Sequence, residues 1–188
     1  MMRTAVASTL TIALLVGCHR GSFSQEAPAP SASVITLGLA IGTCDDIVAC
    51  ERECDGGSAD RCRRLGATYA LGQGASKDET RATALYEHAC DLSDPSACVF
   101  AGQMNEFARG VAKDDVKAAQ LYERACNLQW APGCYNFAIM VERGTGVRQD
   151  RAKAADLYQR ACTAGAQPSC EKAKEMREPL QPAFDAGL

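Results

Sequence analysis

The phrase LYEHAC at residues 85–90 returns as LYERAC at residues 121–126 and as LYQRAC at residues 157–162. Each copy begins 36 residues after the previous one and ends on a cysteine. The repeated Leu, Tyr and Ala are three or four residues from one another, the spacing that places side chains on one face of an α-helix. A helix that recurs with a fixed period of about 20–50 residues indicates a repeat protein, in which similar units stack on one another.

The cysteines keep the same period. Cys54, Cys90, Cys126 and Cys162 are 36 residues apart, and Cys62, Cys98, Cys134 and Cys170 follow them at a distance of eight residues. Of the many ways in which ten cysteines can pair, the period selects four disulfides between residues eight apart, and Cys44 and Cys50 remain as a fifth pair. Eleven cysteines in 188 residues favour an oxidising compartment over a reduced cytosol.

Each unit begins with a helix whose apolar face follows from the spacing. That face holds Cys62, Leu65, Gly66, Tyr69 and Ala70 in the first unit, and Cys134, Phe137, Ala138, Val141 and Glu142 in the third. These residues recur at intervals of three and four, which is helical spacing. We expect the small residue in the middle of the face, Gly66 or Ala138, to let a neighbouring helix approach closely.

A glycine turn and a second helix complete the unit. Gly74, Gly110 and Gly146 lie at one position of the turn, and Asp78, Asp114 and Asp150 lie where a helix N-cap belongs. The second helix then buries Ala82, Leu85, Tyr86 and Ala89 at helical spacing. Asp94 and Pro95 predict the cap and first residue of the next helix, so that each disulfide would close the short loop between consecutive hairpins.

These motifs resemble the Sel-one-like repeat, a relative of the tetratricopeptide repeat, over about residues 54–175. The shared pattern is L-G-x-x-Y, then G-x-G-V and D, then K-A-x-x-L-Y-x-x-A-C. The cysteines eight residues apart make the chain similar to the Hcp-type cysteine-rich proteins. The resemblance implies an all-α fold, an α/α solenoid of about three repeats with half-repeat caps, and a role as a protein-interaction scaffold. The second unit departs from the pattern, with Asn105 at the Tyr69 position and Ala108 at the Gly72 position.

The sequence predicts four segments. They are a signal peptide at residues 1–17, a linker at 18–43, the solenoid at 44–178 and a disordered tail at 179–188. Within the solenoid we expect a cap at 44–54, repeats at 55–90, 91–126 and 127–162, and a polar capping helix at 163–178.

The first 18 residues predict export. An apolar run after Arg3 is too short to span a bilayer and ends in Leu-Val-Gly-Cys at residues 15–18. This resembles a bacterial lipoprotein signal, which implies a lipid on Cys18 and an outer-membrane lipoprotein that faces the periplasm or the cell surface. The alternative is an ordinary secretory signal that happens to end at a cysteine.

The residues that could carry chemistry have simpler explanations. His88 stands where Arg124 and Arg160 stand, at a helix C-terminus, where a cation is favourable. Ser169 and Lys172 match the S-x-x-K pattern of β-lactamases and penicillin-binding proteins, labels that some Hcp-type relatives carry, but no S-D-N or K-T-G element accompanies them. We therefore expect no catalytic site and no cofactor. A zinc site is the weaker alternative to the disulfides.

The chain is thus predicted to bind a protein or peptide of the cell envelope as a monomer, and a purely structural spacer is the alternative. A net charge of −3 gives no attraction to nucleic acid. By similarity to tetratricopeptide arrays, the first helix of each hairpin would line the binding surface. Its outward positions are Arg63, Ala67, Ala70, Val99, Gln103, Glu106, Tyr135, Ile139 and Glu142. Trp130, the one tryptophan, either covers the turn between units or anchors a partner.

Overall fold

A computed structural model describes residues 42–178. The predictions for the signal peptide, for the lipid on Cys18, for most of the linker and for the tail lie outside the described residues. Within residues 42–178 the regular structure consists of eight α-helices and no strand. The helices are α1 (Ile47–Asp55), α2 (Ala59–Leu71), α3 (Glu79–Asp91), α4 (Pro95–Glu106), α5 (Asp115–Asn127), α6 (Ala131–Arg143), α7 (Arg151–Thr163) and α8 (Gln167–Arg177).

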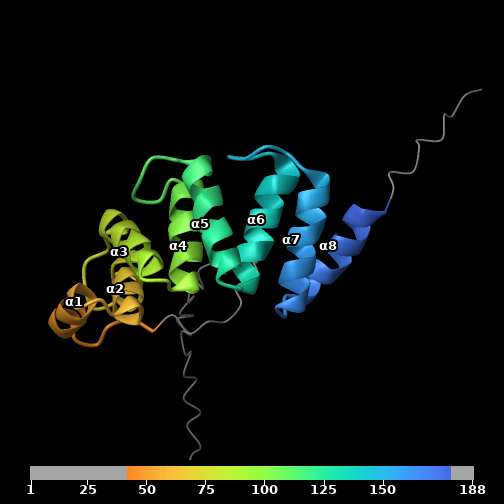
Figure 1. The fold of residues 1–188 in the computed structure, drawn as a ribbon. Helices are drawn as coiled ribbons and strands as arrows, with labels where there is room; N and C mark the ends of the chain where they lie inside the picture. Colours follow the sequence, from red (N-terminus) through yellow and green to blue (C-terminus); the bar gives the residue numbers. More distant parts are fainter. Residues whose placement is uncertain (1–41, 179–188) are drawn as a thin grey trace, which may run out of the picture. The chain divides into compact units, whose positions relative to one another are not determined.

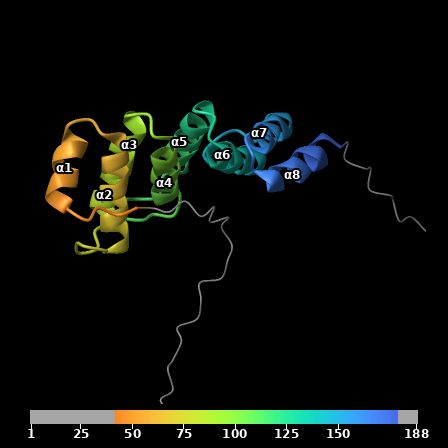
Figure 2. The ribbon, with the colours of Figure 1, turned by 90° about the horizontal axis from the view of Figure 1, so that it is seen from below.

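The helices form successive antiparallel hairpins. Each helix packs against the next one along the chain, and α4 also contacts α6. Figures 1 and 2 show the helices following one another from α1 to α8. This arrangement confirms the predicted α/α solenoid: α2, α4, α6 and α8 are the first helices of their units, and α1, α3, α5 and α7 are the second helices. None of the helices in residues 42–178 is long and apolar enough to cross a membrane.

The predicted caps set where the helices begin. The carboxylates of Asp78, Asp114 and Asp150 accept hydrogen bonds from the backbone three residues ahead, at 2.8–2.9 Å. Asp94 caps α4 in the same way through the backbone N–H groups of Ser96 and Ala97. Each cap satisfies amide donors that the first turn of a helix leaves without a partner, so these aspartates fix the start of four helices.

The core of each hairpin is a tyrosine lying on a small residue. Tyr86 and Tyr122 on the second helices are 4% and 1% exposed. A β-carbon on Gly102 would lie 2.6 Å from the ring of Tyr122, and one on Gly66 would lie 2.9 Å from the ring of Tyr86. The expected close approach of the two helices therefore occurs at these glycines, and it lets a large aromatic side chain fill the space between them.

Four disulfides repeat along the solenoid, and we call them the repeat disulfides. They are Cys54–Cys62, Cys90–Cys98, Cys126–Cys134 and Cys162–Cys170, with Cα–Cα distances of 4.3–4.8 Å. Each one joins the end of a second helix to the first turn of the next helix. Closing so short a loop stabilises the fold by about 2–3 kcal/mol in the chain-entropy model.

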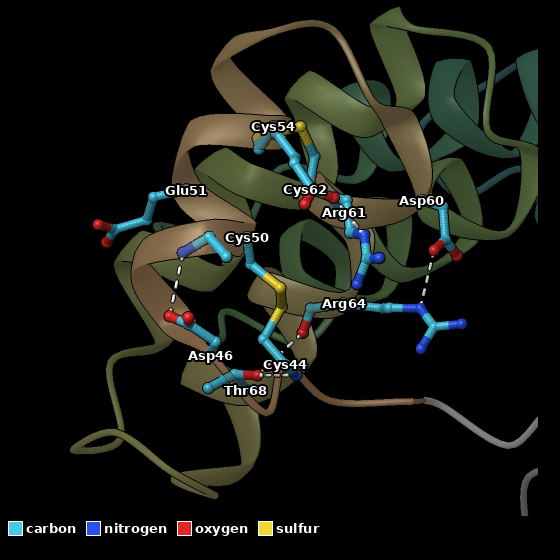
Figure 3. Close-up of a disulfide and its surroundings, with 12 residues drawn as sticks. Cys44, Asp46, Cys50, Glu51, Cys54, Asp60, Arg61, Cys62, Arg64 and Thr68 are labelled. Carbon is cyan, nitrogen blue, oxygen red and sulfur yellow. Dashed lines mark hydrogen bonds and ion pairs between the residues drawn. A yellow bond between two sulfur atoms is a disulfide. The ribbon is translucent and has the colours of Figure 1, made fainter.

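The fifth disulfide, Cys44–Cys50, holds the N-terminal half-repeat. It joins the segment before α1 to α1 itself, with the Cα atoms 6.3 Å apart. The backbone N–H of Cys44 donates to the hydroxyl of Thr68 on α2 at 2.9 Å, as Figure 3 shows. The half-repeat is therefore attached to the first full hairpin by a polar contact as well as by helix packing.

Replacing Ala108 with glycine is expected to raise the free energy of unfolding by roughly 0.5–1 kcal/mol. Ala108 has a φ of 54°, and its counterparts Gly72 and Gly144 have φ values of 69° and 72°. The helix end is otherwise built alike, because the Arg109 N–H reaches the Met104 carbonyl at 2.8 Å just as the equivalent groups do in the other units. A side chain in the left-handed region costs about 1–2 kcal/mol, which the greater freedom of glycine in the unfolded chain partly offsets.

The measurement for this substitution is the urea midpoint of the helical circular dichroism signal. Gly144→Ala is the mirror control and should lower the same midpoint. A lower midpoint for Ala108→Gly would contradict this expectation. It would show that the packing of the alanine methyl group stabilises the fold by more than the strained backbone destabilises it.

Candidate interaction surface

Three residues predicted to face outward are buried instead. Ala67, Ala70 and Val99 are 0%, 9% and 6% exposed. The prediction was wrong for them because α2 and α4 are packed between neighbours: α2 contacts α1 and α3, and α4 contacts α3, α5 and α6. Little of α2 and α4 is left for solvent, so these three side chains are not available to a partner.

Arg63, another residue predicted to face a partner, forms ion pairs within the solenoid. Its guanidinium pairs with Asp60 at 2.6 Å and with Asp94 at 3.1 Å, and its side chain is only 15% exposed. Asp94 is also the N-cap of α4, so the ion pair joins α2 to the start of the next unit. Its place in this network means that Arg63 is a structural residue and not a free binding group.

Two glutamates of the predicted surface are fixed by tyrosines. The Tyr122 hydroxyl donates to Glu106 at 2.7 Å, and the Tyr158 hydroxyl donates to Glu142 at 2.6 Å. Burial, followed by these hydrogen bonds to carboxylates, raises the pKa of both tyrosines far above the ordinary value near 10. Because each bond restrains one carboxylate oxygen, the glutamate side chains present a fixed acceptor at the surface.

Sequence reasoning missed these bonds, although a signal was present. Each pair spans 16 residues and recurs 36 residues later. In the first unit Ala70 stands at the glutamate position, and within residues 42–178 the Tyr86 hydroxyl makes no hydrogen bond. The tyrosine is therefore present in all three units, and the hydrogen bond forms in the two units that also carry the glutamate.

The remaining predicted residues, Gln103, Tyr135 and Ile139, are partly exposed. Tyr135 and Ile139 rest against the core, and the Tyr135 ring meets the Tyr158 ring edge-on with centroids 5.8 Å apart. Together with the two fixed glutamates these residues form what we call the α4–α6 face: Gln103, Glu106, Tyr135, Ile139 and Glu142. Helical spacing places 135, 139 and 142 on one side of α6.

Lys172 on α8 interacts electrostatically with residues of this face. A hydrogen bond from Lys172 to Glu175 raises the pKa of the ammonium group, and the charge of Glu142 and the hydroxyl of Tyr135 add to the effect. The α4–α6 face thus offers apolar surface and restrained carboxylates, and the charge of Glu142 is coupled to that of Lys172. That combination suits hydrogen bonding and packing against a peptide, since each group is held before a partner arrives.

The other candidate residues lie elsewhere. Trp130 is the N-cap of α6 and packs, partly buried, against the core, which favours covering the turn between units over anchoring a partner. Ser169 is fully buried and Cys170 is part of a disulfide, so in this structure the serine hydroxyl is not accessible to a substrate. His88 is exposed on α3, beside the Cys54–Cys62 disulfide.

Comparison with known protein families identifies the repeat. The model of the Sel1 repeat matches the chain three times, over residues 62–94, 95–129 and 131–165. The matches cover more than half of the chain, and each covers one hairpin with part of its flanking turns. No curated protein matches the chain significantly.

Among the solved structures that resemble the chain are three bacterial proteins. A Sel1 repeat protein from Oxalobacter formigenes is 25% identical, with a TM-score of 0.64 over 69% of this chain and 98% of that one. The cysteine-rich protein B of Helicobacter pylori is 25% identical, with a TM-score of 0.54 over 67% and 90% of the two chains. A protective antigen of uropathogenic Escherichia coli, 22% identical, has a TM-score of 0.67 over 69% of this chain but only 28% of its own, and shows the fold alone.

Proposed function

The chain belongs to the Sel1 repeat family, as a cysteine-rich member, and from that premise we propose that it is a non-catalytic scaffold that binds a protein or peptide of the bacterial cell envelope. Sel1 repeat proteins are generally protein-interaction scaffolds. The observation that carries the proposal here is the α4–α6 face, whose groups are partly exposed and already held in place by the core.

The side chains of the α4–α6 face indicate which groups a partner must present. Glu106 and Glu142 each have one oxygen engaged by a tyrosine, and within residues 42–178 the other oxygen accepts no hydrogen bond and can accept one from a partner. Tyr135 and Ile139 together offer a partly exposed apolar surface. We therefore expect the partner to present donors or cations opposite the glutamates and an apolar side chain opposite Ile139, as an extended peptide segment does.

The envelope location rests on two features of the chain. The first 18 residues read as a lipoprotein signal that ends at Cys18, which would anchor the protein to the outer membrane. All ten cysteines within residues 42–178 are paired, as expected of a protein that folds in an oxidising compartment. A monomeric solenoid on a lipid anchor would leave the α4–α6 face free for its partner.

The test is capture of the partner from cells that export the chain with its own signal. After crosslinking of the intact envelope, we expect a specific protein to co-purify with the wild type. The double variant Gln103→Arg with Ile139→Gln should lose it, because truncating or charging a central contact typically weakens an interface about tenfold or more.

A matched control uses the same chemical changes on a second helix. Val116 is 54% exposed and Gln120 is exposed on α5, so Gln120→Arg with Val116→Gln alters charge and polarity outside the α4–α6 face. This variant should retain the partner, and both variants should melt within a few degrees of the wild type. Loss of the partner in both variants, or in neither, would contradict a binding role for the α4–α6 face.

A further inference from the structure

The first junction between units differs from the second and third in one residue of the second helix that follows it. At the second and third junctions an arginine of the following second helix reaches back to the end of the preceding one: Arg124 donates to the Asp91 carbonyl at 3.2 Å, and Arg160 donates to the Cys126 carbonyl at 3.0 Å. At the first junction the same position is His88. The histidine carries a metal-binding group where the other units carry only a hydrogen-bond donor.

The position of His88 brings three potential ligand atoms together. A ring nitrogen of His88 and the sulfur atoms of Cys54 and Cys62 all lie within 4.8 Å of one another. Within residues 42–178 this is the one group of three or more Cys, His, Asp or Glu side chains gathered so closely. The other repeat disulfides therefore lack the third ligand that this one has.

We propose that reduction of the Cys54–Cys62 disulfide creates a site for a thiophilic divalent metal ion, with the two thiolates and the His88 imidazole as ligands. The disulfide would accept two electrons and two protons from a dithiol reductant, which is itself oxidised to a disulfide. The metal ion then displaces both thiol protons into solvent. Two sulfurs and one nitrogen, with water as the fourth ligand, are a set that Zn²⁺ accepts.

The surrounding structure suits such a site. Cys54 ends α1 and Cys62 lies in the first turn of α2, so helix packing holds both cysteines after the bond is cut, with Cα atoms 4.7 Å apart. In a tetrahedral zinc site the sulfurs stand roughly 3.8 Å apart, given zinc–sulfur bonds of about 2.3 Å, and side-chain rotation supplies that separation. Cys54 and Cys62 are buried and His88 is exposed, so the ion would bind the His88 imidazole first and then the two thiolates.

The test uses the full chain reduced by a phosphine without oxygen and titrated with Co²⁺, whose thiolate complexes have a characteristic charge-transfer absorption. We expect the wild type to bind Co²⁺ at least about tenfold more tightly than His88→Arg, which restores the residue of the other junctions. Every other cysteine is common to both proteins, so the difference isolates His88. Displacement by Zn²⁺ should abolish the absorption.

A gain of function is the complementary variant. Arg124→His copies His88 onto the Cys90–Cys98 junction and should add a second Co²⁺ site of the same spectrum. If reduction unfolds the chain, metal binding should restore helical circular dichroism more fully in the wild type than in His88→Arg, because binding is coupled to folding. Equal affinity and equal recovery in the wild type and His88→Arg would overturn the proposal.

Discussion

Replacing Gly146 with alanine is expected to lower the free energy of unfolding by about 3 kcal/mol or more. Gly146 lies in the turn between α6 and α7, with a φ of 69°, and this turn rests on the first residues of α5. A β-carbon there would overlap the backbone carbonyl of Asp115 and lie 2.8 Å from the amide nitrogen of Val116. Overpacking costs about 1–3 kcal/mol and the left-handed backbone about 1–2 kcal/mol more.

The overlap is with backbone, which cannot rotate away as a side chain does. The turn must therefore move off α5, and the contact between adjacent units is lost with it. Chemical denaturation followed by far-ultraviolet circular dichroism measures the loss. Gly57→Ala is the control, since Gly57 has a φ of 90° but a β-carbon there meets nothing within 4 Å.

The control should cost only the backbone strain, partly offset by the lost freedom of glycine in the unfolded chain, and so roughly 0.5–1 kcal/mol. The difference between the two variants is then the contribution of the contact between units. Equal losses would mean that the turn of residues 144–149 separates from α5 readily in solution.

The contact of the glycine turn with α5 also shows which features of the fold can be predicted from the sequence. The period of 36 residues, the aspartate caps and the cysteines eight residues apart are local features, and they predict the helices, their starts and the fold. The docking of the glycine turn on the helix of the previous unit is not local. Gly110 and Gly146 were predicted as turn residues, but only the structure shows that each lies against the preceding second helix, at Glu79 and at Asp115.

The candidate surface was harder to predict for the same reason. Helical spacing says that Ala67, Val99 and Ile139 lie on comparable faces, but not how much of each face the neighbouring hairpins cover. The ion pair between Arg63 and Asp94 spans 31 residues, and the tyrosine–glutamate bonds cross from one helix to the next. Such contacts depend on the rotation of adjacent helices, which the repeat pattern leaves open.

The protein is expected to lose stability steeply above about pH 10, because of the buried tyrosines of the second helices. Burial, chiefly, raises the pKa of Tyr86 to about 12. Burial and then the hydrogen bonds to Glu106 and Glu142 raise the pKa of Tyr122 and Tyr158 further. In the unfolded chain all three titrate near pH 10.

The sign follows from the protons bound in each state. Above about pH 10 the unfolded chain loses tyrosine protons that the folded protein keeps, so rising pH favours unfolding. The stabilisation is complete below about pH 10. Between about pH 10 and 12 each of the three tyrosines contributes a loss of about 1.4 kcal/mol per pH unit, or about 4 kcal/mol per unit together. Against a typical stability of about 5–15 kcal/mol, that slope unfolds the protein within a few pH units.

Denaturant midpoints taken at several pH values between about 8 and 11 measure the slope, and tyrosinate absorbance follows ionisation in the same samples. Tyr86→Phe is the cleanest control, because within residues 42–178 the Tyr86 hydroxyl makes no hydrogen bond that the substitution would remove. That variant should match the wild type near pH 8 and fall less steeply above pH 10 by about a third. Tyr122→Phe should be less stable at every pH, by about 1 kcal/mol for the bond to Glu106, and also less steep. A slope unchanged in both variants would mean that these tyrosines ionise in the folded protein, and that the packing of each ring against its small partner residue is looser than the structure shows.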